Sequence, residues 1–272
     1  MGIKIVFLLF FILFSLEAKE RIVSLSPSLC EILFALDMGD EVVGVSSYSL
    51  YPKAATKLPI VGSYTNPNLE KVIALSPTLV IGQEFNTKSL QDIKKFGIAS
   101  LGVSLKSIAD IRDAIALLGK RFFKQAEAKK LIAAIDDAIK NAKKSQTPHS
   151  VLIVYGLHED LRSGIYIAGH HIFFDEIIKL SGNTNAYTKE STTQPVLNYE
   201  NVIALNPEQI IILHSLKSQP NINIKRALKA WYNIPTRASK NKKISIVDAD
   251  YIHIPSHRIA QTITKLAQEM RE

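Results

Sequence analysis

The stretch NLEKVIALSPTLVIG at residues 68–82 has a second copy, NYENVIALNPEQIII at residues 198–212, which is identical at 8 of 15 positions. Each copy predicts a short helix with an Asn at its start and a Val-Ile-Ala-Leu face, ended by a proline and followed by a buried strand. The same helix-strand unit therefore occurs twice. This pattern predicts two similar lobes, and two copies are too few for a solenoid.

Short β-branched runs alternate with helical stretches around the first copy. Ser26 is a predicted cap for a helix that starts at Pro27, ends near Met38 and is followed by Gly39. The alternation resumes after residue 148, so both halves are predicted to be α/β. The predicted strands are Arg21–Leu25, Val42–Ser46, Leu79–Gln83, Val151–Tyr155 and Ile210–Leu213.

A segment without proline separates the two halves. Its apolar residues recur at spacings of three and four from Ile108 to Phe122, as on one face of a helix. Gly119 can break this helix, in which case Lys124–Lys144 forms a second one, about 31 Å long and able to bridge two lobes. The predicted divisions are a first lobe at 19–106, a linking helical segment at 107–148 and a second lobe at 149–272.

The beginning of the chain has the pattern of an export signal. One positive charge, Lys4, precedes an apolar run from Ile5 to Leu16 that is too short for the hydrocarbon core of a bilayer. Residues 1–18 are therefore predicted to be a signal peptide, cleaved near Ala18. The alternative is a buried first strand or helix.

Composition excludes some classes of protein. The chain has 33 Lys and Arg against 25 Asp and Glu, a net charge of +8, but the basic residues do not form a patch with interleaved aromatics. We therefore expect no nucleic-acid partner. The single cysteine, Cys30, cannot form an intramolecular disulfide and is predicted to be a small buried hydrophobe.

Taken together, several ordered motifs make the chain resemble the periplasmic substrate-binding proteins of ABC importers, of the rigid type that carries cobalamin, ferric siderophores or haem. The resemblance extends over almost all of the chain after the predicted signal peptide. In addition to NYENVIALNPEQIII, the matching stretches are RIVSLSPSLCEILFAL at 21–36, VVGVSSYSLYP at 42–52, LPIVGSYTNPNLEKVIALSPTLVIG at 58–82, AGHHIFFDEIIKLSGNTN at 168–185 and IVDADYIHIPSHR at 246–258.

The resemblance implies two Rossmann-like lobes joined by a single long α-helix, with a ligand cleft between them and limited hinge motion. It implies a periplasmic monomer, not an enzyme and without a catalytic cofactor, that delivers a metal chelate or corrinoid to an inner-membrane permease dimer. The alternatives are a carrier of nickel or another transition metal as a small chelate, an exported hydrolase, and an interaction or metal-storage module. No GxSxG, GxGxxG or phosphate loop supports an enzyme.

Two carboxylates occupy equivalent places in the two copies of the repeat. Glu70 and Glu200 each lie at the start of a predicted helix, where the helix dipole favours a negative charge. The resemblance implies that each docks onto arginines of the permease, one contact per lobe. The alternative is a pair of exposed helix carboxylates with no partner.

All seven histidines lie beyond residue 148. His158 and His214 each follow a predicted strand, and ligands of open α/β sheets lie outside the carboxyl ends of strands. Imidazole binds iron, nickel and copper, so these two histidines are the candidate metal contacts. Surface or loop positions are the alternative for each histidine. The predicted ligand-binding residues of the second lobe are His158, His170, His171, His214, His253 and Arg258.

On the first lobe, the resemblance places ligand contacts after strands and before helices, and aromatic side chains there suit a planar macrocycle. Ser63 stands where some haem carriers of the family have a tyrosine, and Tyr64 follows it, so a haem ligand does not transfer directly. Trp231 is predicted to pack inside the second lobe. The predicted ligand-binding residues of the first lobe are Ser26, Tyr48, Tyr51, Tyr64, Gln83, Glu84 and Phe85.

Overall fold

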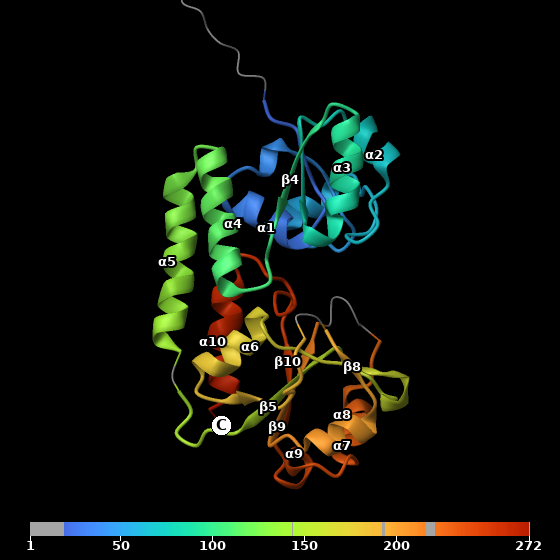
Figure 1. The fold of residues 1–272 in the computed structure, drawn as a ribbon, viewed down its shortest axis with the longest axis vertical. Coiled ribbons are helices and arrows are strands. Elements are labelled where there is room, and N and C mark those ends of the chain that lie inside the picture. Colours follow the sequence, from blue (N-terminus) through green and yellow to red (C-terminus); the bar gives the residue numbers. More distant parts are fainter. Residues whose placement is uncertain (1–18, 143, 192–193, 216–220, 272) are drawn as a thin grey trace, which may run out of the picture.

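The computed structural model describes residues 19–142, 144–191, 194–215 and 221–271. The predicted signal peptide, residues 1–18, lies outside the described residues. The chain forms two α/β lobes, one above the other in Figure 1, with two helices running along one side of the molecule. Among the described residues, no helix combines the length and apolar character needed to cross a membrane.

The first lobe is built on a four-stranded parallel sheet in the order β2-β1-β3-β4. Its strands carry mostly buried Ile, Val and Leu, as expected for a parallel sheet covered by helices. The elements of this lobe are β1 (Ile22–Ser24), α1 (Pro27–Ala35), β2 (Val42–Val45), α2 (Leu69–Ala74), β3 (Leu79–Gln83), α3 (Thr87–Lys95), β4 (Ala99–Val103) and the short 3₁₀ turns Gly39–Glu41, Lys53–Lys57 and Glu84–Asn86.

The second lobe repeats this plan with a parallel sheet in the order β10-β9-β5-β7 and adds a small antiparallel pair, β6-β8. Its strands are β5 (Ser150–Tyr155), β6 (Ile165–Tyr166), β7 (Thr184–Asn185), β8 (Val196–Leu197), β9 (Gln209–His214) and β10 (Ile244–Asp248). Its helices are α6 (Phe173–Leu180), α7 (Tyr199–Leu205), α8 (Ile224–Tyr232), α9 (Arg237–Lys240), α10 (Ile259–Glu269) and the 3₁₀ turn Leu161–Ser163.

The two copies of the repeat form the same unit in the two lobes, as predicted. In the first lobe α2 leads into β3, and in the second lobe α7 leads into β9. The shared asparagine has the same task in both: the side chain of Asn68 accepts from Lys71 N at 2.9 Å, and that of Asn198 accepts from Asn201 N at 2.8 Å. Each side chain satisfies a free amide at the helix start.

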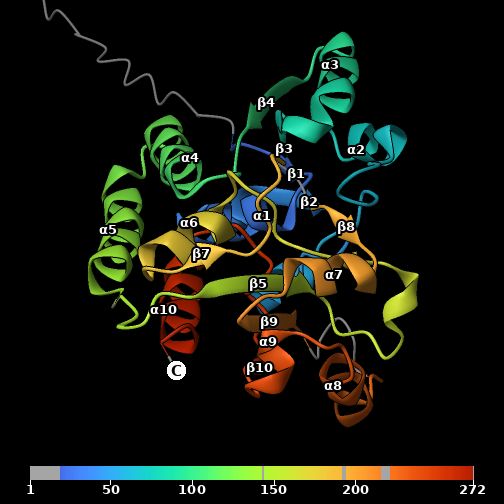
Figure 2. The ribbon, with the colours of Figure 1, turned by 60° about the horizontal axis from the view of Figure 1, so that its bottom comes forward.

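The linking segment is a pair of antiparallel helices, α4 (Ile108–Arg121) and α5 (Gln125–Asn141), which agrees with the prediction of a second helix in this segment. Gly119 does not break α4. A Cβ on Gly119 would lie 2.4 Å from Ala128 Cβ, so the glycine allows α4 and α5 to approach closely. The turn is made after Arg121, where Phe123 has a φ of 57°. Only α5 then leads to the second lobe, where it lies beside α10 (Figures 1 and 2).

Other predicted boundaries shift by a few residues. The first helix ends at Ala35 instead of near Met38, because Asp37 takes a left-handed φ of 58°. The second linking helix covers Gln125–Asn141 instead of Lys124–Lys144.

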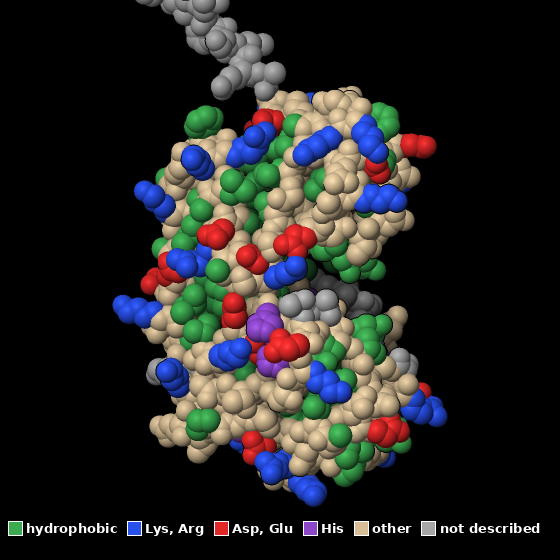
Figure 3. Space-filling model, viewed as in Figure 1, with side chains coloured by type: hydrophobic (Ala, Val, Ile, Leu, Met, Phe, Trp, Pro, Cys, Tyr) green, Lys and Arg blue, Asp and Glu red, His purple; other side chains and the backbone are tan. Residues whose placement is uncertain are grey.

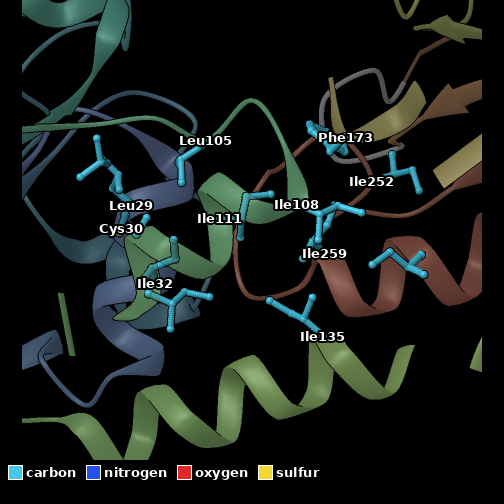
Figure 4. Close-up of a cluster of buried hydrophobic side chains, with 14 of the residues drawn as sticks. Leu29, Cys30, Ile32, Leu105, Ile108, Ile111, Ile135, Phe173, Ile252 and Ile259 are labelled. Atoms are coloured by element: carbon cyan, nitrogen blue, oxygen red, sulfur yellow. The ribbon is translucent and has the colours of Figure 1, made fainter. Parts of the chain in front are cut away.

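One hydrophobic core runs through both lobes and the linking helices. It includes Leu29 of α1, Ile111 of α4, Ile135 of α5 and Ile259 of α10, and Figure 4 shows these side chains converging where the helices meet. Separating the lobes would expose part of this apolar surface to water, which limits their relative motion. Cys30 belongs to the same core, as predicted, and burial raises the pKa of its thiol to about 12.

Candidate ligand-binding site

The main cleft lies between the two lobes, at the carboxyl ends of their strands. It consists of a larger hollow of about 410 Å³ and a smaller one of about 250 Å³. Figure 3 shows the molecule hollowed between the lobes at one edge, with acidic and basic side chains interspersed over the face in view. The two hollows are continuous, because five residues line both of them: Gln83, Phe85, Tyr155, Phe173 and Gln194.

The first lobe supplies one wall from the start of α1 and the loops after β2 and β3. The rings of Tyr64 and Phe85 meet edge to face, with centroids 5.9 Å apart. Both rings are about half exposed, and Tyr48 is 64% exposed at the rim. Asn86 Nδ2 donates to the backbone carbonyl oxygen of Tyr64 at 2.7 Å, which holds the loop that contains Tyr64 against the end of β3. This wall presents aromatic surface that nothing in the described chain covers fully.

The second lobe supplies the facing wall. Tyr155 is the last residue of β5, and its ring stacks on His253 with centroids 5.8 Å apart. The Tyr155 ring also packs edge to face with that of Phe174, with centroids 5.5 Å apart, and Phe173 lies beside Phe174 at the start of α6. The cleft is therefore bounded by aromatic rings from both lobes, an arrangement that suits a large flat ligand.

The described residues that line the larger hollow carry no formal charge at neutral pH. Burial, with a contribution from His214, lowers the pKa of His253 to about 4, and burial raises that of the Tyr155 phenol. The smaller hollow contains Glu84 and Lys106, which form an ion pair with each other. The polar side chains that line the larger hollow are neutral hydroxyls, amides and an imidazole, those of Ser26, Ser28, Tyr48, Tyr64, Gln83, Tyr155, Gln194 and His253. Gln83 Nε2 already donates to Ser26 Oγ, which is fully buried.

A family model described as "Periplasmic binding protein" matches residues 22–251. The chain belongs to this family. A vitamin B12-binding protein of Vibrio parahaemolyticus is 27% identical, over 93% of this chain and 90% of its own length. The uncharacterized ABC transporter substrate-binding lipoprotein YvrC of Bacillus subtilis is 29% identical, over 93% and 81%.

Solved structures of similar proteins have the same two-lobed fold. The periplasmic haem-binding protein RhuT from Roseiflexus has a TM-score of 0.78 and 27% identity, covering 93% of this chain and 98% of its own. The periplasmic vitamin B12 binding protein BtuF of Vibrio cholerae has a TM-score of 0.76 and 25% identity, covering 92% and 96%.

Six of the predicted ligand-binding residues meet in the larger hollow, and Glu84 lies in the smaller one. The six are Ser26, Tyr48, Tyr64, Gln83, Phe85 and His253. The aromatic residues of the second-lobe wall were not predicted from the sequence. Tyr155 ends a strand, and Phe173 and Phe174 begin a helix. The histidines were predicted as ligand contacts from the same kind of position. For Gln194 no such signal existed.

The other predicted residues lie away from the lining of the cleft. Tyr51 covers the guanidinium of Arg258, whose side chain is only 5% exposed, and His214 is fully buried at the end of β9. His158 is partly buried in the loop after β5. Trp231 is fully buried in the core of the second lobe, as predicted.

His170 and His171 lie beside two carboxylates at the start of α6. His171 Nε2 is 2.9 Å from Glu190, and His170 Nδ1 is 3.6 Å from the buried Asp175. No three or more His, Cys, Asp or Glu side chains within the described ranges are grouped so that they could hold a metal ion. The predicted metal contacts His158 and His214 therefore belong to no such group among the described residues.

Glu70 and Glu200 lie in the first turns of α2 and α7, the two equivalent helices of the repeat. Both side chains are exposed, on different lobes. The structure thus presents one carboxylate per lobe at a helix N-terminus, where the dipole stabilises it.

Two partly buried histidines, His253 and His257, make the free energy of unfolding depend on pH. Burial lowers the pKa of His253 and of His257 to about 4 from 6.5. Between pH ~4 and pH ~6.5 the unfolded chain binds more protons than the folded chain. The free energy of unfolding therefore has its full value above pH ~6.5 and decreases as the pH falls toward ~4. We expect urea unfolding to give a free energy lower by about 2 kcal/mol per histidine at pH ~5 than at pH ~7. His257→Asn should remove about half of this dependence, and an unchanged dependence in this variant would contradict the assignment.

Proposed function

We propose that this protein is the solute-binding component of an ABC importer. It is exported by the signal in residues 1–18, begins near Lys19 after cleavage and works as a monomer in the periplasm. It captures a metal chelate or corrinoid between its lobes and delivers it to the inner-membrane permease. The family, the aromatic cleft and the relatives named as vitamin B12-binding and haem-binding proteins support this function.

Among the candidate ligands, the cleft favours a corrinoid with a neutral periphery. Haem carries two carboxylates, and burying a carboxylate is costly without a cation or several donors to receive it. The cation of the described lining is Lys106, and Glu84 already neutralises it. Carboxamides around a corrin ring match the amides of Gln83 and Gln194 and the hydroxyls of the exposed Tyr48 and Tyr64, because each can donate and accept. The uncharged lining of the larger hollow is the observation that carries this choice.

The test compares corrinoids that have the same corrin ring and different side chains around it. A ligand at about 100 times its Kd should stabilise the protein by ~2.7 kcal/mol, which raises the melting temperature measurably. We expect such a shift with cyanocobalamin and with dicyanocobinamide, which lacks the nucleotide loop. We expect little or none with cobyrinic acid, which also lacks the loop but has carboxylates in place of carboxamides. Haemin, ferric siderophores and a nickel chelate complete the panel. A shift with haemin alone, or with cobyrinic acid equal to that with cyanocobalamin, would reject the choice.

The docking surfaces are assigned to Glu70 and Glu200. A carrier that presents one carboxylate on each lobe can meet a permease dimer that has an equivalent basic site on each subunit. Complementary charges at such rims mainly guide encounter and fix register. The corresponding experiment has a large expected effect and is described in the Discussion.

A further inference from the structure

A buried ion pair joins the two lobes directly below the cleft. Glu31 belongs to α1 of the first lobe and Arg258 directly precedes α10 of the second, 227 residues later. Their side chains are 4% and 5% exposed. Arg258 Nε donates to Glu31 Oε2 at 2.9 Å, and Arg258 Nη2 donates to Glu31 Oε1. The guanidinium thus holds the carboxylate with both arms, which fixes their relative orientation as well as their distance.

Residues of both lobes complete this cluster. Ser256 Oγ donates to Glu31 Oε2 at 2.5 Å, and Arg258 Nη1 donates to Asp250 Oδ1 at 2.9 Å. The ring of Tyr51, from the first lobe, lies over the guanidinium with its centroid 4.0 Å from Cζ. The charges are therefore paired, hydrogen-bonded and covered by an aromatic face.

The same two segments form the floor of the cleft. Ser28, one turn before Glu31, and the helix cap Ser26 line the larger hollow. Ile254 and Pro255, which directly precede Ser256, line it as well. A rotation of one lobe against the other would therefore change the floor and the geometry of the ion pair together.

Energetics indicate what the pair contributes. Replacing a buried ion pair by apolar residues of similar size is often neutral or stabilising, because desolvation offsets the attraction. The apolar core that spans both lobes already holds them together. Apolar contacts are not directional, so the core does not fix the angle between the lobes. An ion pair with two parallel hydrogen bonds does fix the relative orientation of the segments that it joins.

We propose that the Glu31–Arg258 pair sets the angle between the lobes and thereby holds the cleft in its ligand-binding geometry. Both residues are positioning residues, since neither lines the cleft. The consequence for affinity rests on the proposed function, whereas the consequence for lobe geometry does not.

The test replaces the pair without leaving a lone buried charge. In Glu31→Leu with Arg258→Met, we expect near-unchanged stability to urea and cyanocobalamin binding at least about tenfold weaker, because the cleft is no longer preorganised. Spin labels on Cys residues at Lys88 of α3 and Lys229 of α8, both exposed, report the distance between lobes in the ligand-free protein. Their distance distribution should broaden or shift in the double variant.

Arg258→Lys provides the second variant, since it keeps the charge and loses the two-armed contact. It should also broaden or shift the distribution of distances between the spin labels. If the double variant fails to fold, this single variant still tests the proposal. The matched control is Asp136→Asn, which breaks the exposed Arg112–Asp136 pair between α4 and α5 and should change neither readout. A distribution in Arg258→Lys identical to that of the unchanged protein would overturn the proposal, whatever the affinity. Failure of the unchanged protein to bind cyanocobalamin would instead count against the proposed function.

Discussion

Uptake of the ligand is expected to fall by at least about tenfold when Glu70 and Glu200 are both changed to Ala, while ligand binding in solution stays within about twofold. The two carboxylates are exposed in the first turns of α2 and α7, outside the cleft. Their removal costs the fold about 0.3–1 kcal/mol each from the lost dipole interaction. It also removes one charged contact from each lobe. Permease-stimulated ATP hydrolysis should fall in parallel, and each single change should have a milder effect.

Both assays must use one preparation of the double variant. Glu127→Ala is the matched control, since Glu127 also lies in the first turn of a helix, α5, but on the linking segment. Normal uptake by the double variant would remove the docking assignment. Loss of ligand binding in solution would place these carboxylates in the ligand site and contradict the arrangement of the lobes.

The second large effect concerns the aromatic wall of the first lobe. Changing Tyr64 and Phe85 together to Ala should weaken ligand binding at least about a hundredfold, because covering each ring contributes about 1.5–3 kcal/mol. The two rings are 42% and 51% exposed without ligand, so the folded protein loses little packing. Calorimetric titration against cyanocobalamin measures the loss of affinity, and urea unfolding measures the loss of stability.

Phe96→Ala is the matched control for this pair. Phe96 is 61% exposed on the same lobe, after α3, and does not line either hollow. Its variant should bind normally. Equal affinity in the Tyr64 and Phe85 double variant and in the unchanged protein would exclude this wall from the ligand site.

The fold was predictable because its decisive signals are local. The two copies of the repeat each contain their own Asn cap, apolar helix face, proline and strand, so the sequence alone shows a duplicated lobe. Gly119 was harder to interpret. A glycine in a helix indicates either a break or a close approach, and only the position of Ala128 on the neighbouring helix distinguishes them.

The site was predictable only where it follows from the topology of a lobe. Gln83 and Phe85 come directly after a strand, and the carboxyl-end rule places them at the cleft. Arg258 was expected to contact ligand, but its partner Glu31 is 227 residues away and no local pattern connects the two. The histidines after residue 148 suggested metal ligation, yet His253 alone among them lines the cleft, and His170 and His171 pair with nearby carboxylates.

The central proposal is that the larger, uncharged aromatic hollow of the cleft binds a corrinoid. Calorimetric titration of the purified protein, beginning near Lys19, with cyanocobalamin at pH ~7 tests this directly, and haemin is the comparison ligand. We expect saturable binding of one cyanocobalamin per chain with a Kd of about 1 µM or tighter, and haemin binding at least about tenfold weaker. No saturable binding of cyanocobalamin, or tighter binding of haemin, would contradict this proposal.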